Sequence, residues 1–313
     1  MTTEPTATLA LLNELEPVVE ANLNRHLASA KEWFPHEYVP WSQGRDFDGV
    51  LGGEAWDPGQ SKLSEVARTS LIVNLLTEDN LPSYHHEIAT IFGRDGAWGT
   101  WVHRWTAEEG RHGIAIRDYL LATRAVDPVA LERARMTHME TGFANAYEGL
   151  VESVAYVSFQ ELATRVSHRN TGTISGDPIC EQLLAKVAND ENLHMIFYRN
   201  LLNAAFDVAP NTTMRAVTKV AKSFQMPGHT IENFGRKSVQ IAMAGVYDLR
   251  LHHDDVLIPV LRQVKAFDRQ LSGDGEAARE ELSAFLADLD AQASRFVERR
   301  EATRARQSAR AAV

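Results

Sequence analysis

Two short stretches of the sequence each combine a glutamate with a histidine three residues further on. Glu109 and His112 occur in "WTAEEGRHG", and Glu191 and His194 occur in "ANDENLHM". Both stretches lie within apolar patterns of helical periodicity, in which residues three apart share one face. Each pair can therefore offer a carboxylate oxygen and an imidazole nitrogen to one metal ion. One such pair alone is weak evidence, because glutamate and histidine also meet by chance on exposed helices.

Two further glutamates precede these pairs at matching intervals. Glu78 lies 31 residues before Glu109, and Glu161 lies 30 residues before Glu191. This internal repeat predicts two helix hairpins, each with a glutamate on its first helix and a Glu-x-x-His pair on its second. Together they would place four carboxylates and two imidazoles around one cavity, as in the carboxylate-bridged two-metal sites of helix bundles. Such a donor set suits iron, with manganese as a substitute.

The residues around these glutamates indicate that the group is buried. Glu78 follows "SLIVNLLT", and Glu161 follows "VAYVSFQ". A carboxylate in an apolar helix is costly unless it is paired or bound to a metal. The alternative, in which these are solvated glutamates on helix faces, fits Glu109 alone but fits the set of six poorly.

Helical periodicity extends over most of the chain and predicts an all-α, ferritin-like bundle with additional flanking helices. We expect one domain over residues 1–313, with a core at about 64–265 and a C-terminal helix and tail over 276–313. An N-terminal helix and an arm rich in proline, glycine and aromatic residues would occupy residues 9–63. Pro82 predicts a kink in a helix over residues 64–93. A turn is expected at residues 170–178.

Charge and composition exclude several classes of protein. The net charge of −10 argues against a general nucleic-acid or anionic-membrane surface, and no apolar run is long enough to span a membrane. Cys180 is the single cysteine, so no intrachain disulfide can form. The N-terminal sequence does not resemble a signal peptide. We therefore expect a cytoplasmic protein.

The four segments that carry the glutamates resemble those of a known family. "TEDNLPSY", "WTAEEGRHG", "FQELAT" and "DENLH" are similar to the iron-site segments of the soluble acyl-[acyl-carrier-protein] desaturases, in the same order. That family reads roughly TEEALPTY, WTAEENRHG, FQERAT and DEKRH. The resemblance extends over about residues 10–265 and is closest to the bacterial branch. Gly110 departs from the asparagine of the family, and two shorter loops leave chain length and double-bond position open.

The resemblance implies a role for particular residues. The family's iron ligands correspond to Glu78, Glu109, His112, Glu161, Glu191 and His194, and none is missing. A threonine near the oxygen-binding face corresponds to Thr164, for which a hydroxyl bonded back to its own helix is the alternative. Asp190 would hydrogen-bond a ligand histidine. Trp33 corresponds to a surface tryptophan that starts the electron path, although ordinary packing is the default for a tryptophan.

The implied reaction is the O2-dependent removal of two hydrogens from neighbouring methylenes of a saturated acyl chain, with a cis alkene and water as products. Apolar residues of the site helices, such as Leu75, Phe92, Phe159 and Met195, could line a channel for that chain, or simply pack in the core. The protein would hold the chain beside the metals and exclude water.

The resemblance also implies partners. The acyl chain would arrive on acyl carrier protein, and electrons would come from a donor such as ferredoxin. Arg215, Lys219 and Lys222 share one helix face and could receive the acidic carrier, or could simply be solvated. A homodimer is expected by analogy. A ferritin-like iron store, a radical-generating subunit of ribonucleotide reductase and a catalytically silent module that binds acyl groups or the carrier remain as alternatives.

Overall fold

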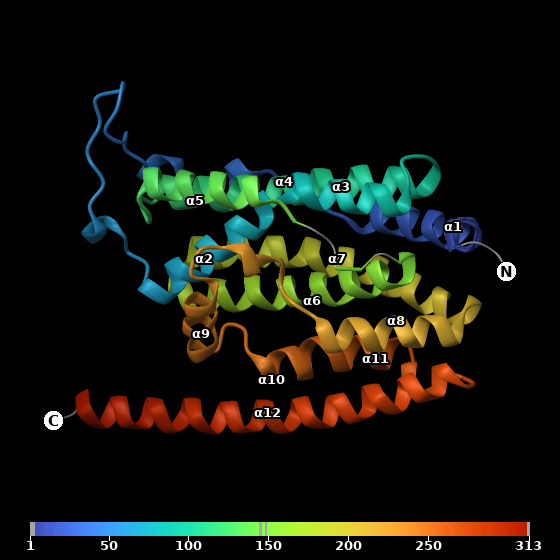
Figure 1. Ribbon diagram of the computed structural model, residues 1–313. Helices are drawn as coiled ribbons and strands as arrows, with labels where there is room; N and C mark the ends of the chain where they lie inside the picture. Colours follow the sequence, from blue (N-terminus) through green and yellow to red (C-terminus); the bar gives the residue numbers. More distant parts are fainter. Residues whose placement is uncertain (1–3, 144–145, 148, 312–313) are drawn as a thin grey trace.

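The computed structural model describes residues 4–143, 146–147 and 149–311, and within them the protein is mostly helical, with no named strand (Figure 1). The all-α prediction is confirmed. No helix in the described ranges is both long and apolar enough to cross a membrane. The helices are α1 (Glu4–Ser29), α2 (Glu65–Asp79), α3 (Leu81–Phe92), α4 (Gly96–Ala122), α5 (Pro128–Thr141), α6 (Leu150–Ser175), α7 (Pro178–Val208), α8 (Pro210–Ser223), α9 (Phe234–Ala244), α10 (Leu249–Leu251), α11 (Ile258–Gln263) and α12 (Asp274–Ala311).

Four helices form the ferritin-like centre of the molecule. Helices α6 and α7 pack along each other as a long antiparallel hairpin, and α2 and α4 pack against them and against one another. Gly172 allows a close approach within the hairpin, because a Cβ atom there would lie 3.2 Å from the Cα atom of Glu181. Figure 1 shows α12 running along the bottom edge of the molecule, below α8, α10 and α11, whereas α3, α4 and α5 lie along the top.

Two predicted boundaries were wrong. The segment 64–93 is two helices rather than one kinked helix, because α2 ends at Asp79 and α3 begins at Leu81. Pro82 therefore lies in the first turn of α3, where a missing N–H costs nothing. Helix α6 continues to Ser175 through part of the expected turn at 170–178. Its end is set by Gly176, which adopts a left-handed conformation, and Asp177 then caps α7.

The arm between α1 and α2 is irregular, as predicted, and one arginine holds it to the bundle. The Arg124 side chain follows α4 and lies in the interior, with the residue only 2% exposed and its guanidinium 4.0 Å from the ring centroid of Phe47. It donates hydrogen bonds to the backbone carbonyls of Arg45 (3.1 Å), Asp46 (3.2 Å), Glu54 (2.9 Å) and Ala55 (3.3 Å), and to the Gln60 side chain (2.8 Å). One side chain therefore fixes both ends of the loop.

We expect Arg124→Ala to lower the free energy of unfolding by about 3 kcal/mol, since several charge-assisted hydrogen bonds from a buried guanidinium to backbone carbonyls are lost. Denaturant unfolding would measure this change. Arg45→Ala is the control, because the Arg45 side chain is exposed and bonds only to exposed Glu54. Its effect should stay below about 1 kcal/mol. An equally small effect for Arg124→Ala would show that the arm does not depend on this anchor.

Candidate metal centre

The six predicted ligand residues meet in the middle of the four-helix centre. Helices α2 and α6 each contribute one glutamate, and α4 and α7 each contribute a Glu-x-x-His pair. All six residues are buried. Their donor atoms form two overlapping groups in which all atoms lie within 4.8 Å of one another. One group is Glu78, Glu109, His112 and Glu191, and the other is Glu109, Glu161, Glu191 and His194.

The overlap of the two groups defines their geometry. Glu109 and Glu191 belong to both groups, whereas Glu78 is found only with His112 and Glu161 only with His194. There are thus two positions that share two carboxylates. Each position also has one further carboxylate and one imidazole, as the internal repeat in the sequence predicts. This arrangement can hold two metal ions bridged by carboxylates.

Both histidines direct one nitrogen into the centre and use the other to bind a carboxylate behind it. His194 donates from Nε2 to Glu108 Oε2 at 2.9 Å, and His112 Nε2 lies 3.4 Å from Asp190 Oδ2. The two Nδ1 atoms are buried and have no hydrogen-bond partner, although carboxylate oxygens surround them. This tautomer leaves an Nδ1 lone pair available to a metal ion.

The glutamates that are not followed by a histidine are held in a similar way. Glu78 Oε1 accepts a hydrogen bond from His168 Nε2 at 2.9 Å, and Glu161 Oε1 accepts one from Trp105 Nε1 at 3.0 Å. The other oxygen of Glu161 is buried and has no hydrogen-bond partner. The same holds for Oε1 of Glu109 and Oε1 of Glu191. The unpartnered atoms therefore gather on the inner side of the group, where a metal ion would take them up.

The electrostatics of the centre call for positive charge. Burial, together with repulsion by Glu109 and Glu191, raises the pKa of Glu161 well above its usual value. Burial on its own would lower the pKa values of His112 and His194, but the surrounding carboxylates raise both well above the usual range. In the absence of cations the centre therefore attracts protons. Divalent cations would supply the same compensation.

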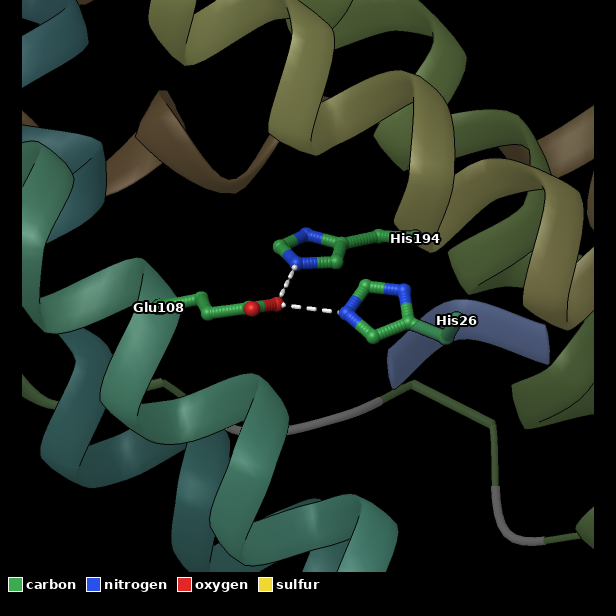
Figure 2. A group of neighbouring side chains, drawn as sticks. All are labelled: His26, Glu108 and His194. Atoms are coloured by element: carbon green, nitrogen blue, oxygen red, sulfur yellow. Dashed lines mark hydrogen bonds and ion pairs between the residues drawn. The ribbon is translucent and has the colours of Figure 1, made fainter. Parts of the chain in front are cut away.

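Figure 2 shows the arrangement behind His194, which the sequence analysis missed. Glu108 Oε2 accepts hydrogen bonds from His194 and from His26, each at 2.9 Å, and Glu108 Oε1 accepts one from Arg104 at 2.7 Å. The His26 and His194 rings are stacked, with their centroids 5.7 Å apart. Although burial opposes it, the hydrogen bonds from His194 and His26 hold the pKa of Glu108 well below its usual value.

Part of this outer layer could have been found in the sequence. Glu108 precedes Glu109 just as Asp190 precedes Glu191, so the internal repeat pointed to an acidic partner for each histidine. His168 lies seven residues after Glu161, two helical turns along the same face. His26 gave no such signal, because only the packing of α1 against α4 and α7 brings it to the centre.

Trp33 takes part in the arrangement behind the other histidine. It is only 2% exposed, so the packing expected by default for a tryptophan is present, and the surface position implied by the resemblance is not found in this chain. Its Nε1 donates to Asp190 Oδ2 at 2.7 Å, and its ring lies within 13° of parallel to that of His112. Arg111 also donates to Asp190 Oδ2 at 2.7 Å. A continuous contact thus runs from Trp33 through Asp190 to His112.

Thr164 lies at the wall of the centre. Its hydroxyl is 3.0 Å from the carbonyl oxygen of Glu161 and 3.3 Å from Glu191 Oε2. The back-bonded arrangement considered from the sequence is therefore present, together with a contact to a predicted ligand. Thr164 also lines two adjoining cavities.

The smaller of these cavities, of about 50 Å³, reaches Glu78 and Glu109. Its apolar lining includes Leu81, Tyr84, Ile88, Phe143, Tyr156 and Val157. The larger, of about 420 Å³, shares Thr77 and Thr164 with it and likewise has a mostly apolar surface. The four residues suggested from the sequence as a channel lining do not line either cavity. Phe92 and Phe159 pack in the core with Met195, and Leu75 packs in a second core cluster.

The predicted basic patch lies on α8, where each of its charges already has a partner. Arg215 lies 3.3 Å from Asp274, Lys219 lies 2.9 Å from Glu152, and Lys222 contacts Glu281. These side chains are exposed and line an open cavity of about 870 Å³. Because exposed ion pairs contribute little energy, an acidic partner could displace them.

Comparison with known proteins supports the interpretation of the helical centre. Residues 7–312 match a family described as fatty acid desaturase. The chain is 54% identical over 297 residues to DesA1 of Mycobacterium tuberculosis, provisionally named an acyl-[acyl-carrier-protein] desaturase, covering 92% of this chain and 88% of the relative. It is 28% identical over 302 residues to a palmitoyl-[acyl-carrier-protein] 4-desaturase of Coriandrum sativum, covering 89% and 77%.

A solved structure is also similar. The X-ray structure of M. tuberculosis DesA2, also provisionally named an acyl-[acyl-carrier-protein] desaturase, superposes with a TM-score of 0.70 at 34% identity, covering 82% of this chain and 95% of that one. With the family match over almost its whole length and a close relative over nine-tenths of it, the chain belongs to the fatty acid desaturase family.

Proposed function

We propose that the protein desaturates a saturated acyl chain carried on acyl carrier protein, using O2 and two iron ions. The observation that carries this proposal is the set of buried donor atoms without partners, contributed by the two histidines and three of the four glutamates. The names of the family and of the relatives support the reaction and the carrier. We propose that residues 1–313 form a single domain that carries out this reaction.

The residues present fit two iron ions. His112 with Glu78, and His194 with Glu161, would each hold one ion, and Glu109 and Glu191 would lie between the two. Two divalent cations would balance four carboxylates and relieve the repulsion among them. The mixture of hard oxygen and imidazole ligands favours iron, and manganese is a plausible substitute in the same site. When bound, the two ferrous ions would supply electrons for the activation of O2.

The chain's own residues would position the substrate and keep the site dry. The narrow cavity brings an apolar wall of α3 and α6 against Glu78 and Glu109, where two neighbouring methylenes could be held. Water exclusion in such a site protects an oxidising step from side reactions. The Thr164 hydroxyl, 3.3 Å from Glu191 Oε2, could hold or pass a proton at that oxygen.

Partners are part of the same proposal. A ferredoxin-type donor would deliver electrons through Trp33 and Asp190 towards His112, and Arg215, Lys219 and Lys222 would exchange their present ion pairs for those with the carrier. We also propose a homodimer and a cytoplasmic location. A ferritin-like iron-handling role is the second candidate, because it needs the same ligands and no acyl substrate.

Glu109→Ala and His194→Ala should each reduce the iron content from about two ions per chain to one or none, because a shared carboxylate or an imidazole is lost. Turnover should fall below detection in both. Iron analysis after anaerobic loading would measure the content, and circular dichroism would show whether the helices remain. Glu181→Gln, an exposed change at the start of α7, is the control. Normal diiron content in either ligand variant would contradict the assignment.

Glu108→Gln should weaken the binding of divalent metal by about tenfold or more, because His194 and His26 would lose their shared charged acceptor. Titration of the apoprotein with Co²⁺, followed by its visible absorption, measures this affinity without any turnover. Glu181→Gln again serves as the control. An unchanged cobalt affinity would mean that Glu108 does not orient His194.

The reaction itself is tested by supplying the iron-loaded protein with saturated acyl carrier proteins of several lengths, ferredoxin, its reductase, NADPH and O2. We expect a product two hydrogens lighter by mass spectrometry, at one favoured chain length. Oxygen consumption and iron oxidation without an alkene would favour the iron-handling role. The absence of bound iron would favour a silent binding module.

A further inference from the structure

Three arginines converge on a cavity on the outer side of the α6–α7 hairpin. The cavity has a volume of about 420 Å³ and is lined by Arg165 and Arg169 of α6 and by Arg199 of α7. Its opposite wall comes from the segment 251–260, which includes a π-helical turn over His252–Leu257. On α6 the lining positions recur at three- and four-residue steps on a different face from that of Glu161 and Thr164. The cavity is therefore separate from the candidate metal centre.

These three arginines are not closely paired, although the charge of Arg165 acts on the Asp255 carboxylate. Among the described residues, the side chains of Arg165, Arg169 and Arg199 form no ion pair and no hydrogen bond, and the Nε atom of Arg199 is buried without a partner. Arg25, from α1, also has buried Nε and Nη2 atoms without partners. Burial, and then the charge of Arg25, lower the pKa of Arg199. Two partly buried arginines, Arg165 and Arg199, thus lie around one cavity with the exposed Arg169, and no close ion pair neutralises them.

Three comparable arginines elsewhere in the described part of the chain are paired. Arg111, Arg117 and Arg300 also have a buried Nε atom without a partner, but each bonds a carboxylate through another nitrogen. The single acidic side chain in the lining of the cavity is Asp255, which is exposed and makes no ion pair with the three lining arginines. The cavity is therefore positive in a protein whose net charge is −10.

We propose that this cavity binds a phosphate monoester with a small apolar substituent. Guanidinium groups bind phosphate oxygens in bidentate geometry, and a phosphate dianion would offset three arginines and one aspartate better than a single carboxylate would. The volume is larger than a phosphate group requires, and it falls in the range of small-molecule sites. Apart from Asn170, the remaining wall is apolar, with Leu162, Val166, Met195, Pro259 and Val260 available to contact the substituent.

A bound phosphate would contact the arginines of α6 and α7 and lie against the facing segment 251–260. Helices α6 and α7 lie on one side of it and the segment 251–260 on the other, so binding would favour the folded state. The site is independent of the proposed desaturation, and its occupancy can be measured without turnover.

Isothermal titration calorimetry of the full-length protein, in a buffer free of phosphate, would test the proposal with butyl phosphate and inorganic phosphate. We expect saturable binding of butyl phosphate below about 10 mM, at least about threefold tighter than that of inorganic phosphate. Arg199→Gln and Arg169→Gln should each weaken binding by about tenfold or more. Because Arg169 is exposed, its variant should fold even if Arg199→Gln does not.

Arg133→Gln is the matched control, since Arg133 is exposed on α5 and does not line the cavity. Its affinity for butyl phosphate should equal that of the unchanged protein. Equal affinities for butyl phosphate and inorganic phosphate would overturn the proposal of a monoester ligand and would identify free phosphate as the ligand instead. The site would be overturned altogether if butyl phosphate did not bind saturably. It would also be overturned if Arg199→Gln and Arg169→Gln bound butyl phosphate as tightly as the unchanged protein does. A changed oligomeric state in those variants, with phosphate binding unaltered, would overturn it in favour of a subunit interface.

Discussion

The mutual repulsion of four buried carboxylates is the constraint on which the rest of this structure depends. Glu78, Glu109, Glu161 and Glu191 lie in the interior of a four-helix bundle, where solvent cannot screen them. Such a group is stable only if positive charge is brought among its members and if each carboxylate is held in place. The bundle provides the second condition by giving the outer oxygens of Glu78 and Glu161 a hydrogen-bond donor each.

The outer elements complete the centre. Helix α1 contributes His26, and the arm after it contributes Trp33, so the chain before α2 supports both histidines through Glu108 and Asp190. These contacts are related by the internal repeat but differ in chemistry, since one histidine is supported through an imidazole and the other through an indole. The two candidate metal positions are therefore similar in their donor residues and different in their surroundings. Arg124 then holds the remainder of the arm in place.

Much of this centre could be predicted from the sequence because ligand spacing is a local property. A Glu-x-x-His pair needs only one helix, so the positions of Glu109, His112, Glu191 and His194 were readable together with the repeat that relates them. The all-helical fold followed from the same periodicity. Helix ends were harder to predict, because Pro82 is tolerated at a helix start and Thr171 to Thr173 continue a helix that packs closely on α7.

Contacts between distant segments could not be predicted in the same way. His26 lies 82 residues from Glu108 in sequence, and no local pattern marks it. The cavity lining was missed for a related reason: apolar residues such as Phe92 and Phe159 look the same in sequence whether they face a cavity or a core. The burial of Trp33 likewise depends on how the arm folds back over α4.

The break between α2 and α3 has a consequence for how this enzyme family can diversify. Glu78 belongs to α2, whereas Leu81, Tyr84 and Ile88, which line the narrow cavity, belong to α3. The two helices meet at Asn80 without forming one continuous rod. Substitutions or small shifts in α3 can therefore reshape the cavity while the buried carboxylate of Glu78 on α2 keeps its place. Under the proposed function, α3 would set the size of the substrate, and the neighbouring α2 would hold one of the metal ligands.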